Sequence, residues 1–200
     1  ATRLFPLTEN TPKALLEIGG KKVLDYLLEK VNKIKKIDEI FVISNDKFYP
    51  HFKSWAQEKD QSVQKITVLN DHTTSDENKL GAVGDIYYVL EQTGIDDDLM
   101  ILAGDNLFTF ELTDFVAEFE KNPSDYITVH ELNNIKELTK MGVAELSASD
   151  EVIGLEEKPA NPKSNIAVDP FYIYMRETLP LFKEYIEGGN NPDAPGNFPA

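Results

Sequence analysis

An unbroken apolar run at residues 99–103 stands near the middle of the chain, with acidic residues before it and Gly104 and Asp105 after it. Such a run is typical of a strand buried on both faces, as the central strands of parallel sheets are. Ligands of open parallel sheets bind beyond the carboxyl ends of the strands, so the Asp105 side chain is expected to point into that crevice. Asp105 is therefore a candidate metal ligand, although it could instead cap the turn or helix that follows.

The apolar positions on either side of this run predict alternating helices and strands. Apolar residues at helical spacing, with lysines opposite them, predict an amphipathic helix over residues 22–36. The same reasoning predicts strands at 39–44, 65–70 and 126–130, and helices around 48–55, 80–94 and 115–119. Because strands and helices alternate, we expect a Rossmann-like α/β fold with a mostly parallel sheet, flanked by helices and joined by right-handed crossovers.

After residue 132 the pattern changes to strands at 142–146, 152–158 and 167–175, separated by short or polar loops. This spacing favours a small antiparallel extension over the crevice. A helix is expected at 179–186, and the Gly-, Asn- and Pro-rich segment 188–200 predicts a loop.

Composition removes several function classes. The absence of cysteine excludes disulfides and thiolate metal sites and fits a cytoplasmic protein, and the three histidines are too scattered for a zinc site. No apolar run approaches the roughly 18 residues of a membrane span, so no membrane partner is expected. The net charge of -15 argues against a nucleic-acid partner, because affinity for phosphate polymers depends on Lys and Arg.

Positive charge is nonetheless concentrated at the start of the chain. Residues 1–36 hold eight Lys and Arg against four Asp and Glu, an island that suits a small polyanion but that a solvated helix face would also explain. The loop at residues 1–13 carries Arg3 and Lys13 as its only cations. Together their side chains could clamp a polyphosphate and offset the charge of a leaving pyrophosphate.

Neither the G-x-G-x-x-G fingerprint nor the P-loop motif occurs, which makes a dehydrogenase or a P-loop NTPase unexpected. Five other motifs follow one another along the chain. They are Thr2-Arg3 with Pro12-Lys13, Leu80-Gly81-Ala82-Val83-Gly84, Ala103-Gly104-Asp105-Asn106, Gly142-Val143-Ala144-Glu145 and Glu156-Glu157-Lys158-Pro159. In this order, and over nearly the whole chain, they resemble the sequence blocks of the sugar-1-phosphate nucleotidyltransferases, also called nucleotide-sugar pyrophosphorylases.

The resemblance implies that Arg3 and Lys13 bind the nucleoside triphosphate and support attack on its α-phosphate. Backbone at Leu80 and Gly81 would approach the base. Asp105 would bind Mg²⁺, a cation that commonly takes one or two carboxylates plus substrate phosphates. Taken alone, Lys13 could be an ordinary surface lysine, and Gly81 could only ease helix packing.

The sugar side of the reaction is assigned in the same way. The resemblance implies that Glu157 accepts hydrogen bonds from sugar hydroxyls, that Lys158 binds the phosphate of the sugar 1-phosphate, and that Gly142 lets backbone approach the sugar. Without the family, Glu157 and Lys158 would be assigned to a charged turn. The expected division is a nucleotide-binding α/β core at 1–132 and a sugar-phosphate-binding part of the same domain at 133–200.

Three departures from the family pattern qualify this expectation. The family begins with a buried strand and a Gly-rich phosphate loop before its Thr-Arg pair, and this sequence starts inside that loop. The family's second metal-binding Asp belongs to a later block, so the sequence is expected to be a piece of a longer protein with half of the metal site. Residues 167–172 stand where the family has Thr-Gly or a similar small pair, which puts sugar contacts from that strand in question.

Other functions share parts of the pattern. A CTP-dependent cytidylyltransferase acting on a phosphorylated alcohol is the nearest, but the Glu157-Lys158 pair favours a sugar. A metal-dependent glycosyltransferase would use the acidic triplet 96–98, which precedes its strand and so lies at the wrong edge of the sheet. A non-catalytic relative that binds nucleotide sugars or partner subunits is opposed by the joint presence of the predicted cations and Asp105. Homo-oligomer formation is left open.

Overall fold

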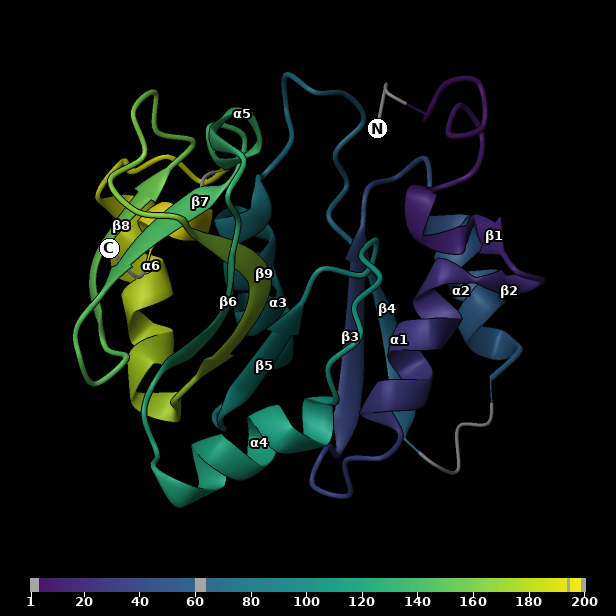
Figure 1. The fold of residues 1–200 in the computed structure, drawn as a ribbon. Coiled ribbons are helices and arrows are strands. Elements are labelled where there is room, and N and C mark those ends of the chain that lie inside the picture. The colour runs from purple at the N-terminus through teal and green to yellow at the C-terminus, as the bar shows by residue number, and fades with distance from the viewer. Residues whose placement is uncertain (1–3, 60–63, 194, 199–200) are drawn as a thin grey trace. The chain divides into compact units, whose positions relative to one another are not determined.

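The computed structural model describes residues 4–59, 64–193 and 195–198. Its contacts divide the chain into two compact units (Figure 1). Unit 1 comprises Ala1–Lys79 and Ala103–Pro123, and unit 2 comprises Leu80–Leu102 and Ser124–Ala200. The chain therefore leaves unit 1 for one helix and one strand, and returns to it before entering unit 2 again.

Unit 1 contains a parallel pair of strands, β3 (Glu39–Ser44) and β4 (Lys65–Asn70), in direct register from Glu39 opposite Lys65. The connecting helix α2 (Tyr49–Gln57) packs on this pair, and its apolar stripe buries Phe52 and Trp55. Both strands and the helix lie where the periodicity predicts them.

The rest of unit 1 begins with a hairpin of β1 (Glu17–Ile18) and β2 (Lys21–Lys22). Its two-residue turn is Gly19-Gly20, with φ of 63° and 80°, the left-handed geometry that suits tight hairpins. Helix α1 (Val23–Val31) follows directly and buries one apolar face, while α4 (Leu112–Lys121) belongs to the second stretch of this unit. The hairpin is absent from the predicted elements, although the Gly-Gly pair is its usual signal.

Unit 2 is built on a five-stranded antiparallel sheet. Its strands are β5 (Leu99–Leu102), β6 (Tyr126–Glu131), β7 (Gly142–Leu146), β8 (Val152–Glu157) and β9 (Ile166–Tyr174). The long strand β9 pairs with three neighbours, β7 at its beginning, β5 at its end and β6 along both parts. Its register to β6 jumps between Thr128 opposite Asp169 and Ile127 opposite Tyr172, and Pro170, which has no N–H to donate, lies in that jump.

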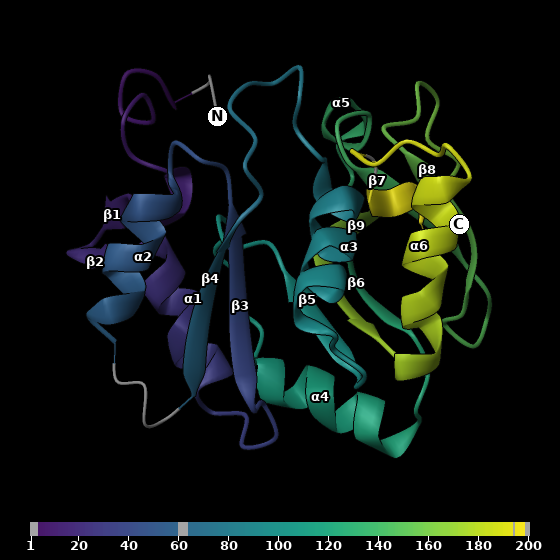
Figure 2. The ribbon, with the colours of Figure 1, turned by 180° about the vertical axis from the view of Figure 1, so that it is seen from behind.

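Two helices cover one face of this sheet, α3 (Ala82–Thr93) and α6 (Leu179–Glu187), and both are in front of the sheet in Figure 2. Their apolar sides and the sheet share a core that includes Val83, Val168, Tyr172 and Phe182. The remaining elements are short. They are α5 (Ile135–Leu138) and the 3-10 helices Lys13–Leu15, Arg176–Thr178 and Pro195–Asn197.

The α/β class and the antiparallel extension are confirmed, but the expectation of a mostly parallel sheet holds only for β3 and β4. The alternation of strand and helix predicts that β5 and β6 are parallel strands. They do run in the same direction, because both are antiparallel to β9, but β9 lies between them. Strand β5 is half-buried and not fully buried, because in the described part of the chain it pairs with β9 alone and so ends the sheet.

Candidate active site

Lys13 begins a 3-10 helix, Lys13–Leu15, whose other two residues are buried. Pro12 precedes it with φ -63° and ψ 143°, the extended backbone that proline favours. Burial of Ala14 and Leu15 anchors the segment, so the Lys13 side chain leaves the backbone at a fixed point of unit 1. Its Nζ donates a hydrogen bond to Asp105 Oδ2 at 2.9 Å.

Asp105 lies in the turn after β5, closed by a hydrogen bond from Asn106 N to Ala103 O at 3.3 Å. Gly104 suits this turn because a Cβ there would lie 3.2 Å from Leu24 Cδ1 of helix α1, a tight contact that the leucine would have to relieve by shifting. Both oxygens of the Asp105 carboxylate are engaged, Oδ2 by Lys13 and Oδ1 by Asn106 Nδ2 at 2.9 Å. Two of the predicted catalytic residues, 92 positions apart, are thus brought into contact.

The third predicted catalytic residue, Arg3, lies outside the described residues. Within the described part of the chain no group of three or more His, Cys, Asp or Glu side chains could hold a metal ion. The Asp105 carboxylate supplies the hard oxygen donors that Mg²⁺ prefers, and its side chain is 44% exposed. It fits Mg²⁺ as one ligand among others, with phosphate oxygens and water completing the coordination.

Unit 2 brings together the residues predicted for the sugar phosphate. Gly142 of β7 lies opposite Glu157 of β8 on one side and Val168 of β9 on the other. A Cβ at Gly142 would stand 3.2 Å from Val168 Cβ and 3.5 Å from Glu157 Oε2. The missing side chain at Gly142 therefore leaves space beside the Glu157 carboxylate.

Lys158 follows Glu157 with φ 47°, a left-handed conformation that is uncommon outside glycine. Its N–H donates to Met141 O at 3.0 Å, and this bond holds the turn. Its Nζ lies 3.1 Å from Glu157 Oε1, with the lysine side chain 59% and the glutamate side chain 17% exposed. The result is a nearly buried carboxylate beside an accessible ammonium group, a suitable pair for a hydroxyl and a phosphate of one ligand.

Tyr172 of β9 is a polar neighbour that the motifs did not indicate. Burial, together with the negative charges of Glu157 and Asp169, raises the pKa of Tyr172 to about 12. The phenol is therefore protonated at neutral pH and can donate a hydrogen bond. The apolar pattern of β9 gives no sign of this role, because the proximity of Tyr172 to Glu157 arises only in the folded chain.

Leu80 and Gly81 stand at the start of α3. Gly81 has φ 80° and ψ 165°, and a Cβ there would lie 2.6 Å from the backbone C and O of Pro192. The Pro192 carbonyl in turn accepts a hydrogen bond from Val83 N at 2.8 Å and so caps the helix. Chain packing alone thus explains the glycine, and its role toward a base stays a prediction.

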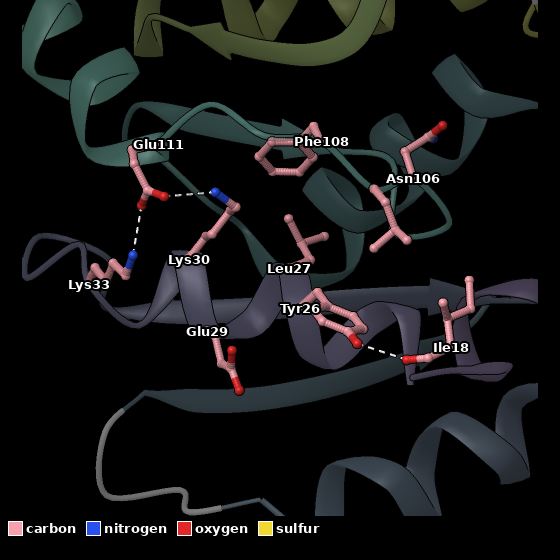
Figure 3. Close-up of a pocket in the computed structure, with 10 residues that line it drawn as sticks. Ile18, Tyr26, Leu27, Glu29, Lys30, Lys33, Asn106, Phe108 and Glu111 are labelled. Carbon is pink, nitrogen blue, oxygen red and sulfur yellow. Dashed lines mark hydrogen bonds and ion pairs between the residues drawn. The ribbon is translucent and has the colours of Figure 1, made fainter. Parts of the chain in front are cut away.

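A separate surface cavity of about 440 Å³ lies in unit 1 (Figure 3). It is lined by apolar side chains that include Leu27 and Phe108, with Lys30 and Glu111 at one end. Neither Lys13 nor Asp105 lines it, so this cavity is not the predicted reaction site.

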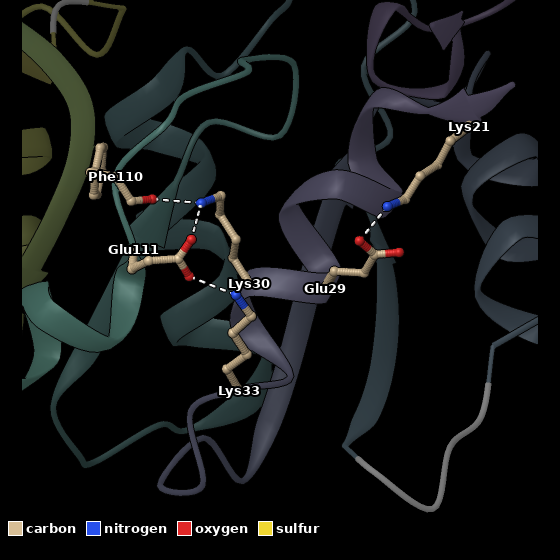
Figure 4. Close-up of polar contacts among 6 residues, drawn as sticks. All are labelled: Lys21, Glu29, Lys30, Lys33, Phe110 and Glu111. Atoms are coloured by element: carbon tan, nitrogen blue, oxygen red, sulfur yellow. Dashed lines mark hydrogen bonds and ion pairs between the residues drawn. The ribbon is translucent and has the colours of Figure 1, made fainter. Parts of the chain in front are cut away.

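The positive island predicted at the start of the chain is largely neutralised by carboxylates within unit 1 (Figure 4). Glu111 binds both Lys33 and Lys30, at 2.7 Å and 2.9 Å, and these hydrogen bonds lower its pKa to about 2. The other pairs are Lys13–Asp105, Lys21–Glu29, Lys22–Glu58 and Lys36–Glu120. Attraction of a polyanion by the whole island is therefore weaker than the sequence alone indicates.

In the described ranges no helix has the length and apolar character needed to cross a membrane.

The model of the nucleotidyl transferase family matches residues 1–194. A "Bifunctional protein GlmU" of Methanococcus aeolicus is 31% identical over 170 residues, which are 82% of this chain and 35% of that protein. A glucose-1-phosphate thymidylyltransferase of Streptomyces griseus is 31% identical over 173 residues, 86% of this chain and 46% of the relative. The chain thus spans between a third and a half of the length of these two relatives.

The fold is shared with solved structures as well. A UDP-glucose pyrophosphorylase in complex with UDP-glucose superposes with a TM-score of 0.74, at 17% identity, over 92% of this chain and 75% of that one. At this identity the likeness concerns the fold alone. The family match over nearly the whole sequence goes further, and the chain belongs to the nucleotidyl transferase family, among the sugar-1-phosphate nucleotidyltransferases whose motifs it carries.

Proposed function

We propose that this protein transfers a nucleotidyl group from a nucleoside triphosphate to a sugar 1-phosphate, giving a nucleotide sugar and pyrophosphate. The observation that carries the proposal is the contact between Lys13 and Asp105, which joins a cation and a carboxylate from distant parts of unit 1 at 2.9 Å. The family match supplies the reaction class. The names of the relatives indicate different bases and sugars, so the proposal specifies neither the base nor the sugar.

The reaction joins two anions, so its main requirement is to hold them in line while positive groups reduce their repulsion. In the proposed roles, Lys13 binds triphosphate oxygens together with Arg3, and the leaving pyrophosphate departs with this charge beside it. The sugar phosphate oxygen attacks the α-phosphorus as the bond from that phosphorus to the pyrophosphate oxygen breaks. No covalent intermediate with the protein is needed.

Mg²⁺ is proposed to bind at the Asp105 carboxylate. When bound, it would neutralise phosphate charge and polarise the phosphoryl oxygens. The ammonium group of Lys13 now occupies one side of that carboxylate, and an arriving triphosphate offers this lysine a competing anion. Release of Lys13 from Asp105 would then free an oxygen for the metal.

On the sugar side, Glu157 is proposed to accept hydrogen bonds from sugar hydroxyls and Lys158 to bind the phosphate. Support comes from their geometry, because the carboxylate is mostly shielded from water while the ammonium group is accessible. A shielded acceptor binds hydroxyls more strongly than one in full solvent contact. The space beside Gly142 leaves room for the ring.

The direct test measures pyrophosphate release by the full chain with Mg²⁺, for ATP, GTP, CTP, UTP and dTTP, each combined with glucose, mannose or N-acetylglucosamine 1-phosphate. Phosphocholine with CTP forms a separate arm for the cytidylyltransferase alternative. Controls omit the acceptor or add a chelator. We expect release with at least one hexose 1-phosphate and loss of that release with the chelator.

Absence of pyrophosphate above background with every pair would reject the enzyme proposal. Binding of nucleotide sugars without turnover would then favour a regulatory relative. Release only with phosphocholine would replace the sugar by a phosphorylated alcohol. The three results differ in kind, so one panel separates the three functions.

A further inference from the structure

The chain after α6 runs over two of the predicted ligand-binding positions of unit 2. Residues 190–193 and 195–198, which we call the strap, form the yellow end of the ribbon beside β8 in Figure 1. At its beginning, Asn190 Nδ2 donates to Tyr185 O at 3.0 Å, and Tyr185 Oη donates to Asn191 O, also at 3.0 Å. Pro192 then caps α3 and contacts Gly81.

The far end of the strap is anchored in the core of unit 2. The Phe198 ring stacks on Phe182, with centroids 3.9 Å apart, and meets the edges of Tyr174 and Tyr185 at 5.4 Å and 5.6 Å. Aromatic contacts of this kind add to the free energy of simple burial. The strap is therefore fixed at both ends.

Between these anchors, buried Gly196 lies against the Glu157 carboxylate. A Cβ at Gly196 would stand 2.6 Å from Glu157 Oε2, closer than real Cβ atoms approach, and 3.0 Å from Leu155 Cδ2, a tight contact. The other carboxylate oxygen, Oε1, is 3.1 Å from Lys158 Nζ. The strap backbone and Lys158 thus enclose Glu157 from two sides.

We propose that Gly196 is a positioning residue for the sugar subsite, where the strap backbone fixes the rotamer of the Glu157 carboxylate that receives the sugar hydroxyls. This inference rests on the proposed function and deepens it. A free glutamate side chain loses rotamer entropy when it is fixed. The strap bears that cost during folding, so the carboxylate is already placed when a hexose 1-phosphate arrives.

The structure also indicates why substitution would act on binding more than on folding. Gly196 does not have a positive φ, so alanine fits its backbone. The nearest atom to the new methyl group is the far end of the Glu157 side chain and not backbone, so the methyl group displaces that carboxylate before it moves the strap. Gly196→Ala is therefore expected to displace the Glu157 carboxylate while the strap stays in place.

The test compares steady-state constants of the wild type and Gly196→Ala with the best substrate pair. We expect KM for the sugar 1-phosphate to rise roughly 10- to 100-fold, since misplacement by about 1 Å can cost that much, while KM for the triphosphate is unchanged. The matched control is Gly154→Ala on β8, the strand that carries Glu157. A Cβ there would press on Glu145 Oε1 at 3.1 Å, a carboxylate outside the predicted site. This control should keep both KM values.

A second comparison uses Glu157→Asp, which withdraws the carboxylate from Gly196 by one methylene. Glu157→Asp alone should raise the sugar KM, and adding Gly196→Ala to it should raise KM little further, because the clash has gone. Thermal unfolding of each variant checks that the fold is kept.

An active wild type whose sugar KM is unaffected by Gly196→Ala, or whose two KM values rise together, would overturn the positioning role. Full additivity in the double variant would overturn it as well. A wild type inactive with every pair is a different result, since it removes the proposed function and this inference with it.

Discussion

The Lys13–Asp105 ion pair adds little to the stability of the fold. The two side chains are 38% and 44% exposed, and exposed pairs contribute about 0–1 kcal/mol. Their positions are fixed instead by buried neighbours, Leu15 beside the lysine and Leu24 under the turn of the aspartate. The charged groups can therefore change partners without disturbing what holds them, as a phosphate-binding site requires.

Asp105→Asn is expected to reduce kcat by about 100-fold or more, because it removes the charge that would hold Mg²⁺, as loss of one transition-state contact does elsewhere. The melting temperature should change little, since the amide is isosteric and the ion pair is exposed. Pyrophosphate release and thermal unfolding of the same preparation measure both. Asp76→Asn, an exposed carboxylate of a loop in the same unit, is the control. Wild-type turnover in Asp105→Asn would remove Asp105 from the metal site.

Glycines show where single residues could be predicted from the sequence and where they could not. The Gly-Asp pair directly after a predicted strand indicates a turn at Gly104, and it places Asp105 at the end of that strand. The family motif predicts that backbone at Gly81 approaches the base, yet Pro192, more than a hundred residues later, is enough to explain its geometry. The local composition predicts only a loop at Gly196, and its position beside Glu157 depends on packing between distant segments that no local pattern encodes.

At the scale of elements, periodicity predicts the longer helices and strands because each of them repeats its apolar positions over several residues of one buried face. It could not find β9 as the hub of unit 2, since strand pairing is set by contacts between distant segments. Thus the alternation predicts β5 and β6 in one parallel sheet, whereas the antiparallel β9 lies between them. The short hairpin of β1 and β2 was missed because two-residue strands have no period to detect.

Helices α1 and α4 are joined through Glu111, and this link predicts a pH dependence. Hydrogen bonds from Lys33 and Lys30 lower the Glu111 pKa from 4.5 to about 2. The folded state thus keeps this carboxylate ionised where the unfolded state takes up a proton. Its stabilising contribution is complete above pH 4.5 and is lost as the pH falls from there to about 2.

We therefore expect the melting temperature of the wild type to fall more steeply over this acidic range than that of Glu111→Gln. Calorimetric scans at a series of pH values measure the two slopes. The other carboxylates with lowered pKa values, Asp25, Glu39 and Glu77, are present in both proteins and cancel in the difference. Equal slopes would mean that Lys30 and Lys33 do not lower the Glu111 pKa in the folded state relative to the unfolded state.

At the scale of the whole molecule, the division into contact units does not follow the chain. Residues 80–102 belong to unit 2, although segments on both sides of them belong to unit 1. The expected functional division at residue 132 follows the order of the sequence. That order cannot show that residues 80–102 pack with the later part of the chain. That division stays a prediction about function, and the candidate site residues occur in both units, Lys13 and Asp105 in one, Glu157 and Lys158 in the other.

The charge of the whole molecule predicts where it will associate. With 35 acidic and 20 basic residues, copies repel one another at neutral pH, and this repulsion vanishes near the isoelectric point of about 4.6. Exposed apolar side chains such as Leu7, Ile135 and Ile153 can then make contacts.

Light scattering measured against pH should peak near 4.6, and the precipitate should dissolve again at neutral pH. Because the ionised form of Glu111 persists below this pH in the folded state, the association should precede acid unfolding, with native far-ultraviolet circular dichroism in the fraction still dissolved. A scattering peak that coincides with loss of the dichroism signal would instead assign the precipitation to unfolded chains.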